Sequence, residues 1–234
     1  MIQENLHKIR ETISEVATHC NRNPEDIRLV AVSKRFPVEV MREAIAAGQM
    51  IFGENYIQEA VQKKNLLGEV VKLHFIGNLQ SNKAKFAVDT CSMVETVDRL
   101  KIAKAMNRYL EETEHSLDVL IQVNIGFDQN KSGVSPDESE TLLKKIRDLP
   151  RLRVRGLMTM PPFMEDPEAV RPFFRDLRRL SEKLEDKGLL GDHGKTELSM
   201  GMSQDYQVAI EEGATLIRVG TAIFGQRPAP EKQQ

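Results

Sequence analysis

The stretch RLVAVSKRFP, residues 28–37, contains the first strand that the sequence predicts. Leu29 to Ser33 form a short apolar run of the kind that a buried β-strand uses. A lysine, Lys34, follows at the point where this strand ends. An amine is more stable in water than at the end of a hydrophobic strand. Its position therefore needs an explanation, and the rest of the chain supplies the context.

Seven further apolar runs follow along the chain, separated by segments with helical periodicity. The strand-like runs are MIFG (50–53), LHFIG (73–77), SMVETV (92–97), DVLIQVN (118–124), VRGLMTM (154–160), TELSM (196–200) and LIRVG (216–220). The helix-like segments are Val38–Ala47, Asn55–Leu67, Lys83–Val88, Asp98–Glu114, Pro136–Asp148, Glu165–Lys187 and Tyr206–Glu212. A helix also precedes the first strand, because Leu6, Ile9, Ile13 and Val16 recur at helical spacing.

Eight strands, each followed by a helix or by the chain end, predict an α/β protein with a single (β/α)8 barrel, the TIM barrel. A doubly wound open sheet is the alternative, but it usually has a glycine-rich loop after its first strand. Here KRFP follows, without a glycine. We expect one domain over residues 1–225, including the N-terminal helix, and a disordered tail over residues 226–234.

The composition excludes several classes of function. The net charge is −2 and the pI is about 6.3, so the chain lacks the basic surface that binds nucleic acid or an anionic membrane. No apolar run reaches the roughly 18 residues of a membrane span, and the N-terminus has no signal-like apolar core. Two distant cysteines and five scattered histidines match no metal spacing. We expect a cytoplasmic protein without a metal site.

Small and hydroxyl-bearing residues follow the last two predicted strands. Ser199-Met200-Gly201-Met202-Ser203 comes after the seventh strand, and Gly220-Thr221 comes after the eighth. Each sequence alone is typical of an ordinary turn. In barrels, however, the loops after strands 7 and 8 often build a phosphate site from hydroxyls and backbone N–H groups. Together the two loops predict such a site.

Lys34 and Arg218 each allow two interpretations. Lys34 is either a surface lysine whose amine extends into water or an imine-forming lysine, which requires partial desolvation of its amine. Arg218, between Ile217 and Val219, forms either an internal salt bridge, for example to Glu197, or a contact with a ligand. An imine-forming lysine, a phosphate site and an arginine near a ring nitrogen are together the requirements of pyridoxal 5′-phosphate (PLP).

The same residues lie in motifs that resemble those of the YggS/PROSC family of PLP homeostasis proteins. The motifs extend from about Leu29 to Gly225, in the order of the family. They are LVAVSK, FGENYIQEA, LHFIGNLQSNK, QVNIGFDQNKSGV, RGLMTMPP, LSMGMSQDY and IRVGTAIFG. The resemblance implies the barrel of fold-type III PLP proteins, which is like the N-terminal domain of alanine racemase.

The resemblance also implies roles for seven residues. Lys34 would hold PLP as an internal aldimine, and Arg218 would face the pyridine nitrogen. The remaining five would surround the cofactor: Ser203, Gly220 and Thr221 as the phosphate cradle, and Asn55 and Met200 along its sides. The sequence departs from the family motif at Asn78, where members often have histidine or proline. This position would lie beside the opening of the cofactor site, so the resemblance does not define the details of access there.

The family's role is control of PLP, vitamin B6 and amino-acid pools, without an established catalytic turnover. We therefore expect a carrier that binds PLP and passes it to apo forms of PLP-dependent enzymes, which would contact it transiently. An always-cationic Arg218 would leave the pyridine nitrogen unprotonated and weaken the electron sink. The alternative is a monomeric racemase-like enzyme. Racemases of this type add a second domain, and only nine residues follow Gly225. We expect a monomer, and we interpret His74 as a hydrogen-bonded core residue rather than an acid or base.

Overall fold

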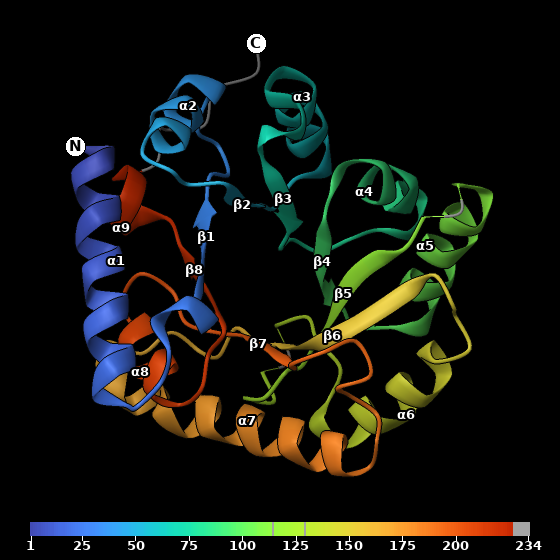
Figure 1. The fold of residues 1–234 in the computed structure, drawn as a ribbon. Helices are drawn as coiled ribbons and strands as arrows, with labels where there is room; N and C mark the ends of the chain where they lie inside the picture. The colour runs from blue at the N-terminus through green and yellow to red at the C-terminus, as the bar shows by residue number, and fades with distance from the viewer. Residues whose placement is uncertain (114, 129, 227–234) are drawn as a thin grey trace.

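The computed structural model describes residues 1–113, 115–128 and 130–226. Its eight strands pair in parallel and in sequence order to form a closed barrel (Figure 1). This confirms the predicted (β/α)8 fold. The sequence predicts a disordered tail over residues 226–234. Residues 227–234 lie outside the described residues, so the structure does not test this prediction for them. Gln226 is described and is exposed.

The strands agree with the predicted runs to within a few residues. They are β1 (Arg28–Val32), β2 (Ile51–Glu54), β3 (Lys72–Phe75), β4 (Met93–Val97), β5 (Leu117–Gln122), β6 (Leu152–Met158), β7 (Glu197–Ser199) and β8 (Leu216–Val219).

The helices alternate with the strands, and short 3-10 turns begin or extend several of them. The helices are α1 (Ile2–His19), α2 (Val38–Ala46), α3 (Ile57–Leu67), α4 (Ala84–Thr90), α5 (Leu100–Thr113), α6 (Pro136–Ile146), α7 (Arg171–Asp186), α8 (Tyr206–Glu211) and α9 (Thr221–Phe224). The 3-10 turns are η1 (Pro24–Asp26), η2 (Gly68–Val70), η3 (Ser81–Lys83) and η4 (Pro167–Val170).

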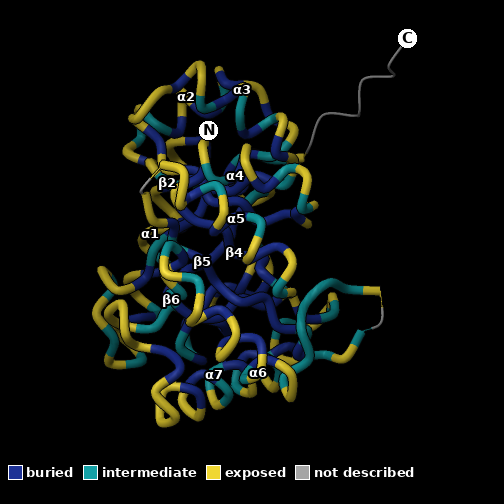
Figure 2. The backbone as a smooth tube through the Cα atoms, turned by 90° about the vertical axis from the view of Figure 1, so that its right-hand side faces the viewer, coloured by how far each residue is buried: buried dark blue, intermediate teal, exposed yellow. Residues whose placement is uncertain are grey.

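Alternation along each strand divides the apolar side chains into two groups, because successive residues of a strand point to opposite faces. A small group of five residues fills the barrel: Val30, Met93, Leu120, Met158 and Leu216. The larger core lies between the barrel and the helices. In Figure 2 the strands β4 and β5 are almost wholly buried, whereas the outer sides of α6 and α7 are exposed.

The N-terminal helix α1 closes the helical layer beside the last strand. Its buried stripe includes Leu6, Ile9 and Ile13, as their spacing predicted, and Val16 packs against it. Figure 1 shows α1 alongside α8 and α9, which it contacts. The first helix and the last two helices of the described chain therefore pack against one another at the β8–β1 side of the barrel.

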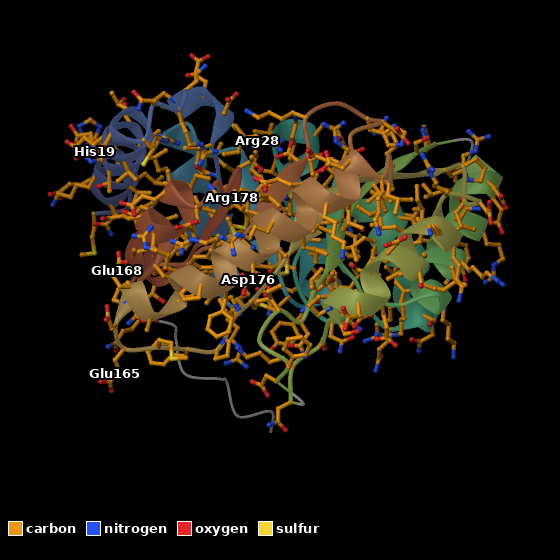
Figure 3. All side chains as sticks on the ribbon, turned by 90° about the horizontal axis from the view of Figure 1, so that it is seen from below. His19, Arg28, Glu165, Glu168, Asp176 and Arg178 are labelled. Atoms are coloured by element: carbon orange, nitrogen blue, oxygen red, sulfur yellow. The ribbon has the colours of Figure 1, made fainter. Side chains whose placement is uncertain are left out.

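Charged side chains cover the outer face of α7, where Asp176 and Arg178 are labelled in Figure 3. Arg171, Arg175 and Arg178 form ion pairs with Glu212, at 3.2, 3.1 and 3.4 Å. These three arginines of α7 are thus engaged with an acidic side chain, which leaves less free positive charge on this face for nucleic acid. No helix within the described ranges is long and apolar enough to span a membrane.

Neither cysteine is in a disulfide. Cys91 lies in the core beside β4, and burial raises the pKa of its thiol to about 12. Cys20 is half-buried at the end of α1. Across the part of the chain that the structure describes, no three His, Cys, Asp or Glu side chains gather as metal ligands would.

Candidate functional site

A cavity of about 560 Å³ opens at the carboxyl ends of the strands, and six of the seven predicted site residues line it. They come from β8 and from the segments after β1, β2, β7 and β8: Lys34, Asn55, Ser203, Arg218, Gly220 and Thr221. The seventh, Met200, is fully buried in the core and is not among the lining residues. Met160 and Met202, more than a third exposed, line the cavity instead.

Lys34 reaches the cavity because of its place after β1. Val30 faces the barrel interior, and Val32, two residues further on, lies on the same side at the end of the strand. The lysine lies in a turn after the strand, is half-buried and lines the cavity together with Val32. This placement answers the question raised by its position in the sequence: Lys34 ends the strand at a cavity.

A cradle for an anion forms where the loops after β7 and β8 meet. The backbone N–H groups of Gly220 and Ala222 both point to Oγ of Ser203, each at 3.4 Å. These long hydrogen bonds bring two backbone donors and one hydroxyl to a single point of the cavity wall, an arrangement suited to phosphate oxygens. A Cβ at Gly220 would lie 3.2 Å from the carbonyl oxygen of Val32, so glycine allows β8 to approach β1 closely here.

Asn55 brings an unused acceptor to the same cavity. Its Oδ1 is buried and has no hydrogen-bond partner among the described residues. A buried polar atom of this kind costs free energy unless a ligand or water satisfies it. Gly77 packs directly on the Asn55 backbone, because a Cβ at Gly77 would lie 2.1 Å from the Asn55 carbonyl oxygen. The Asn55 side chain therefore offers an acceptor to a ligand that carries a hydroxyl group.

Arg218 lines the cavity from the interior of the barrel and is only 3% exposed. Its guanidinium donates hydrogen bonds to Oγ of Ser199 and, at 2.8 Å, to the carbonyl oxygen of Thr159. The alternative that Arg218 pairs with Glu197 is wrong, because Glu197 forms an ion pair with Arg28 and accepts a hydrogen bond from Thr215.

A chain of buried hydrogen bonds connects Arg218 to a carboxylate. Ser199, which accepts a hydrogen bond from Arg218, donates its own proton to Glu95. The other oxygen of Glu95 lies 2.6 Å from Nδ1 of His74. A carboxylate only accepts, so His74 donates from Nδ1. His74 is buried and hydrogen-bonded, which agrees with its interpretation as a core residue.

The electrostatics of these hydrogen-bonded residues favour a negatively charged Glu95 and a positively charged Arg218. Burial raises the pKa of Glu95, but the hydrogen bond from His74 and the charge of Arg218 outweigh it, so that the pKa lies below its usual range. Burial lowers the pKa of Arg218, and Glu95 counteracts that effect. An arginine starts from a pKa so high that it stays cationic. The site therefore presents a fixed positive charge to the cavity, balanced from behind by Glu95.

A smaller cavity of about 350 Å³ adjoins the first one. The two share part of their lining, including Asn55, Met160 and Phe163. Asn78 lines the smaller cavity and donates to Ser132 at 3.1 Å. The position at which this sequence departs from the YggS/PROSC motif thus lies beside the main cavity.

Sequence reasoning did not find Glu95 or Asp205. Glu95 is an acidic residue within the apolar run SMVETV, and Arg218 is a basic residue within the apolar run LIRVG. Two opposite charges in buried strands could have been matched as partners, and this was the signal that the sequence offered. Asp205 lines the main cavity, and its carboxylate accepts a hydrogen bond from the Met202 N–H. Burial raises its pKa. Nothing in the run SQDY distinguishes this aspartate from an ordinary turn residue.

Comparison with known proteins agrees with the fold. The model of the family "Alanine racemase, N-terminal domain" matches residues 5–228. The pyridoxal phosphate homeostasis protein of Escherichia coli (strain K12) is 42% identical over 99% of both chains. The structure of PipY from Synechococcus elongatus PCC7942 without PLP superposes with a TM-score of 0.85 at 36% identity, covering 96% of this chain and all of that one.

The same PipY protein has been solved with PLP bound; that structure has a TM-score of 0.83, 34% identity and the same coverage. An alanine racemase from Clostridium difficile 630 has a TM-score of 0.77 at 15% identity, over 98% of this chain and 58% of the racemase, which shows the shared fold alone. The class of protein is therefore an alanine-racemase-type barrel. Within this class, the chain belongs to the pyridoxal phosphate homeostasis protein family.

Replacing Glu95 by glutamine tests the buried chain of hydrogen bonds. Glu95→Gln keeps the shape of the side chain but removes the larger of the two negative charges that act on the buried Arg218, the other being Asp205, and we expect a loss of about 3 kcal/mol in the free energy of unfolding. Urea denaturation followed by circular dichroism measures it. The control is Glu69→Gln, which removes an ion pair of a carboxylate that is 95% exposed; there the loss should stay below about 0.5 kcal/mol. Equal losses in the two variants would contradict the buried charge pair.

Proposed function

We propose that this protein binds PLP at the barrel mouth, holds it through Lys34, and serves in the control of vitamin B6 and amino-acid pools. The observation that carries the proposal is the convergence of three groups on one cavity. These are the amine of Lys34, the buried charge of Arg218, and the donors around Ser203. The relatives named pyridoxal phosphate homeostasis proteins and the PLP-bound PipY structure support it.

The residues present fit the chemical groups of PLP. The Ser203 hydroxyl and the N–H groups of Gly220 and Ala222 would hold the phosphate, with Thr221 beside them. The buried Oδ1 of Asn55 would accept a hydrogen bond from the ring hydroxyl. PLP supplies an aldehyde that reacts reversibly with amines, and Lys34 is the lysine that lines this cavity in the described part of the chain.

Two features support a carrier rather than a catalyst. First, a permanently cationic Arg218 facing the pyridine nitrogen would disfavour its protonation, which weakens PLP as an electron sink. Second, the titratable side chains lining the main cavity, over the described residues, are Lys34, Asp205 and Arg218. Racemisation needs a proton donor and an acceptor on opposite faces of the substrate. Asp205 is engaged with the Met202 backbone and Arg218 does not give up its proton.

Replacing Lys34 tests the covalent attachment. Wild-type protein with added PLP should show a visible imine absorption band, and borohydride should then attach the cofactor irreversibly to the peptide that contains Lys34. Lys34→Ala should lose the band and the labelled peptide, since it lacks the amine. Absorption spectroscopy and peptide mass mapping measure both.

The matched control is Lys72→Ala, because Lys72 is exposed and begins β3 at the opposite end of the barrel. It should retain the band in full. Attachment of the cofactor to another lysine in wild-type protein would contradict the assignment of Lys34, and absence of any band would contradict the proposed function.

The carrier hypothesis predicts no amino-acid turnover. The PLP-loaded protein should not remove α-deuterium from amino acids in excess of its own concentration, because a cationic Arg218 would leave the pyridine nitrogen unprotonated and make the cofactor a weak electron sink. Proton NMR on a panel of deuterated L- and D-amino acids measures the loss of deuterium. Catalytic loss from any of them would identify a racemase-like enzyme instead.

The recipients of the cofactor would be apo forms of PLP-dependent enzymes, and the carrier would act as a monomer of 26.5 kDa in the cytoplasm. We expect the loaded protein to reactivate an apo-enzyme even when a phosphatase removes free PLP. Enzyme assays with and without phosphatase measure this transfer. Reactivation that phosphatase abolishes would show simple release of PLP into solution.

Light scattering tests the expected monomer by measuring the mass of the protein. A mass of two chains would exclude the monomer.

A further inference from the structure

The turn that carries Lys34 has an unusual backbone. The N–H of Phe36 donates to the carbonyl oxygen of Ser33 at 3.0 Å, so Lys34 and Arg35 are the central residues of a four-residue turn. Arg35 has a φ of 65°. Residues with a side chain seldom adopt this left-handed conformation, and they keep it only when surrounding contacts enforce it. Contacts from residues around Lys34 must therefore hold the turn in this conformation.

A buried lysine from α3 makes these contacts on the side facing the helices. Nζ of Lys63 donates to the carbonyl oxygen of Ser33, to Oε1 of Glu54 and to Oε1 of Glu59, each at 2.7 Å. An ammonium group has three N–H donors, and all three are used. Lys63 is 3% exposed and Glu54 is fully buried. A lysine this deeply buried is rare unless it is paired.

The two glutamates extend this contact to both sides of Lys34. The Ser33 hydroxyl donates to Oε1 of Glu54 at 2.6 Å, and the backbone N–H of Arg35 donates to Oε1 of Glu59 at 2.6 Å. The residue before Lys34 and the residue after it are thus both bound to the same group of three charged side chains. Lys63, Glu54 and Glu59 are named the Lys63 cluster below.

The Lys63 cluster lies outside the main cavity: Lys63 and Glu54 are buried, whereas the Glu59 side chain is 22% exposed. Burial raises the pKa of Glu54 to about 6 although Lys63 lowers it. None of the three residues lines the main cavity. They do not touch a ligand there, so any effect on Lys34 passes through the backbone of the turn.

We propose that the Lys63 cluster positions Lys34 for reaction with an aldehyde, by holding the turn of residues 33–36 in its left-handed conformation. Lys63, Glu54 and Glu59 are positioning residues in this proposal, which rests on the proposed function. Covalent capture requires the amine to meet the aldehyde carbon in a narrow range of positions. A relaxed turn would widen the range of positions of the amine without altering the phosphate cradle after β7 and β8.

The variant that tests the proposal is the double substitution Lys63→Met with Glu54→Gln. It removes both members of the buried pair together, which avoids leaving an unpaired charge in the core. Lys63→Met removes the donor to the carbonyl oxygen of Ser33. The matched control is Lys64→Met on the same helix, since Lys64 pairs with the exposed Glu69 and does not contact the turn.

Three measurements separate positioning from a merely structural role. Amide hydrogen exchange in protein without PLP should be at least about tenfold faster at Arg35 and Phe36 in the double variant than in Lys64→Met. The rate of covalent capture of PLP, by stopped-flow absorption, should fall at least about tenfold. The affinity for pyridoxine 5′-phosphate, which has the phosphate but no aldehyde, should be unchanged.

The outcomes are distinct. Capture at the wild-type rate by the folded double variant would overturn the proposal and leave the proposed function intact. An equal loss of capture and of pyridoxine 5′-phosphate affinity would also overturn it, because the cluster would then support the barrel in general. Failure of the wild-type protein to capture PLP would instead contradict the proposed function. If the double variant does not fold, Glu59→Ala, which leaves the Lys63–Glu54 pair in place, should show the same pattern of faster exchange and slower capture.

Discussion

The site depends on the hydrogen bonding between the first and the last strand of the barrel. β1 and β8 pair in parallel, with Val30 opposite Arg218 and Ala31 opposite Val219. Because parallel strands keep this register to their ends, Lys34 after β1 and Gly220 after β8 come to the same edge. Residues almost two hundred positions apart in the chain thereby line one cavity. Without this closure, a lysine and a phosphate cradle would lie at two distant ends of an open sheet.

Two groups of buried charges lie on the two sides of these strand ends. Inside the barrel, Arg218 is balanced through Ser199 by Glu95. Between the barrel and α3, Lys63 is balanced by Glu54. A buried ion pair contributes little net stability, because desolvation offsets the attraction between the charges. Both groups of charges therefore suggest a role in fixing geometry: one holds the guanidinium at the cavity wall, and the other holds the backbone on either side of Lys34.

The incorrect salt bridge between Arg218 and Glu197 shows what could not be predicted from the sequence. Glu197 and Arg218 lie on neighbouring strands, which made a salt bridge between them plausible. In the actual register Ser199 is opposite Leu216, so Glu197 is level with Ala214. Four residues of strand separate that level from Arg218, which is about 13 Å at the usual rise. The register depends on how the whole barrel closes, and a single sequence does not specify it.

The sequence by itself determined the eight strands and their order, because apolar periodicity and strand-end chemistry are local properties, and together with the family resemblance it named six residues that line the cavity. It placed Met200 at the cofactor on resemblance, whereas the structure places this side chain in the core. Only the tertiary structure decided which charges face one another, including Glu95 behind Arg218 and Lys63 behind the Lys34 turn. Their partners come from other strands and helices, and a buried charge acquires its role only when folding removes water and brings that partner within a hydrogen bond.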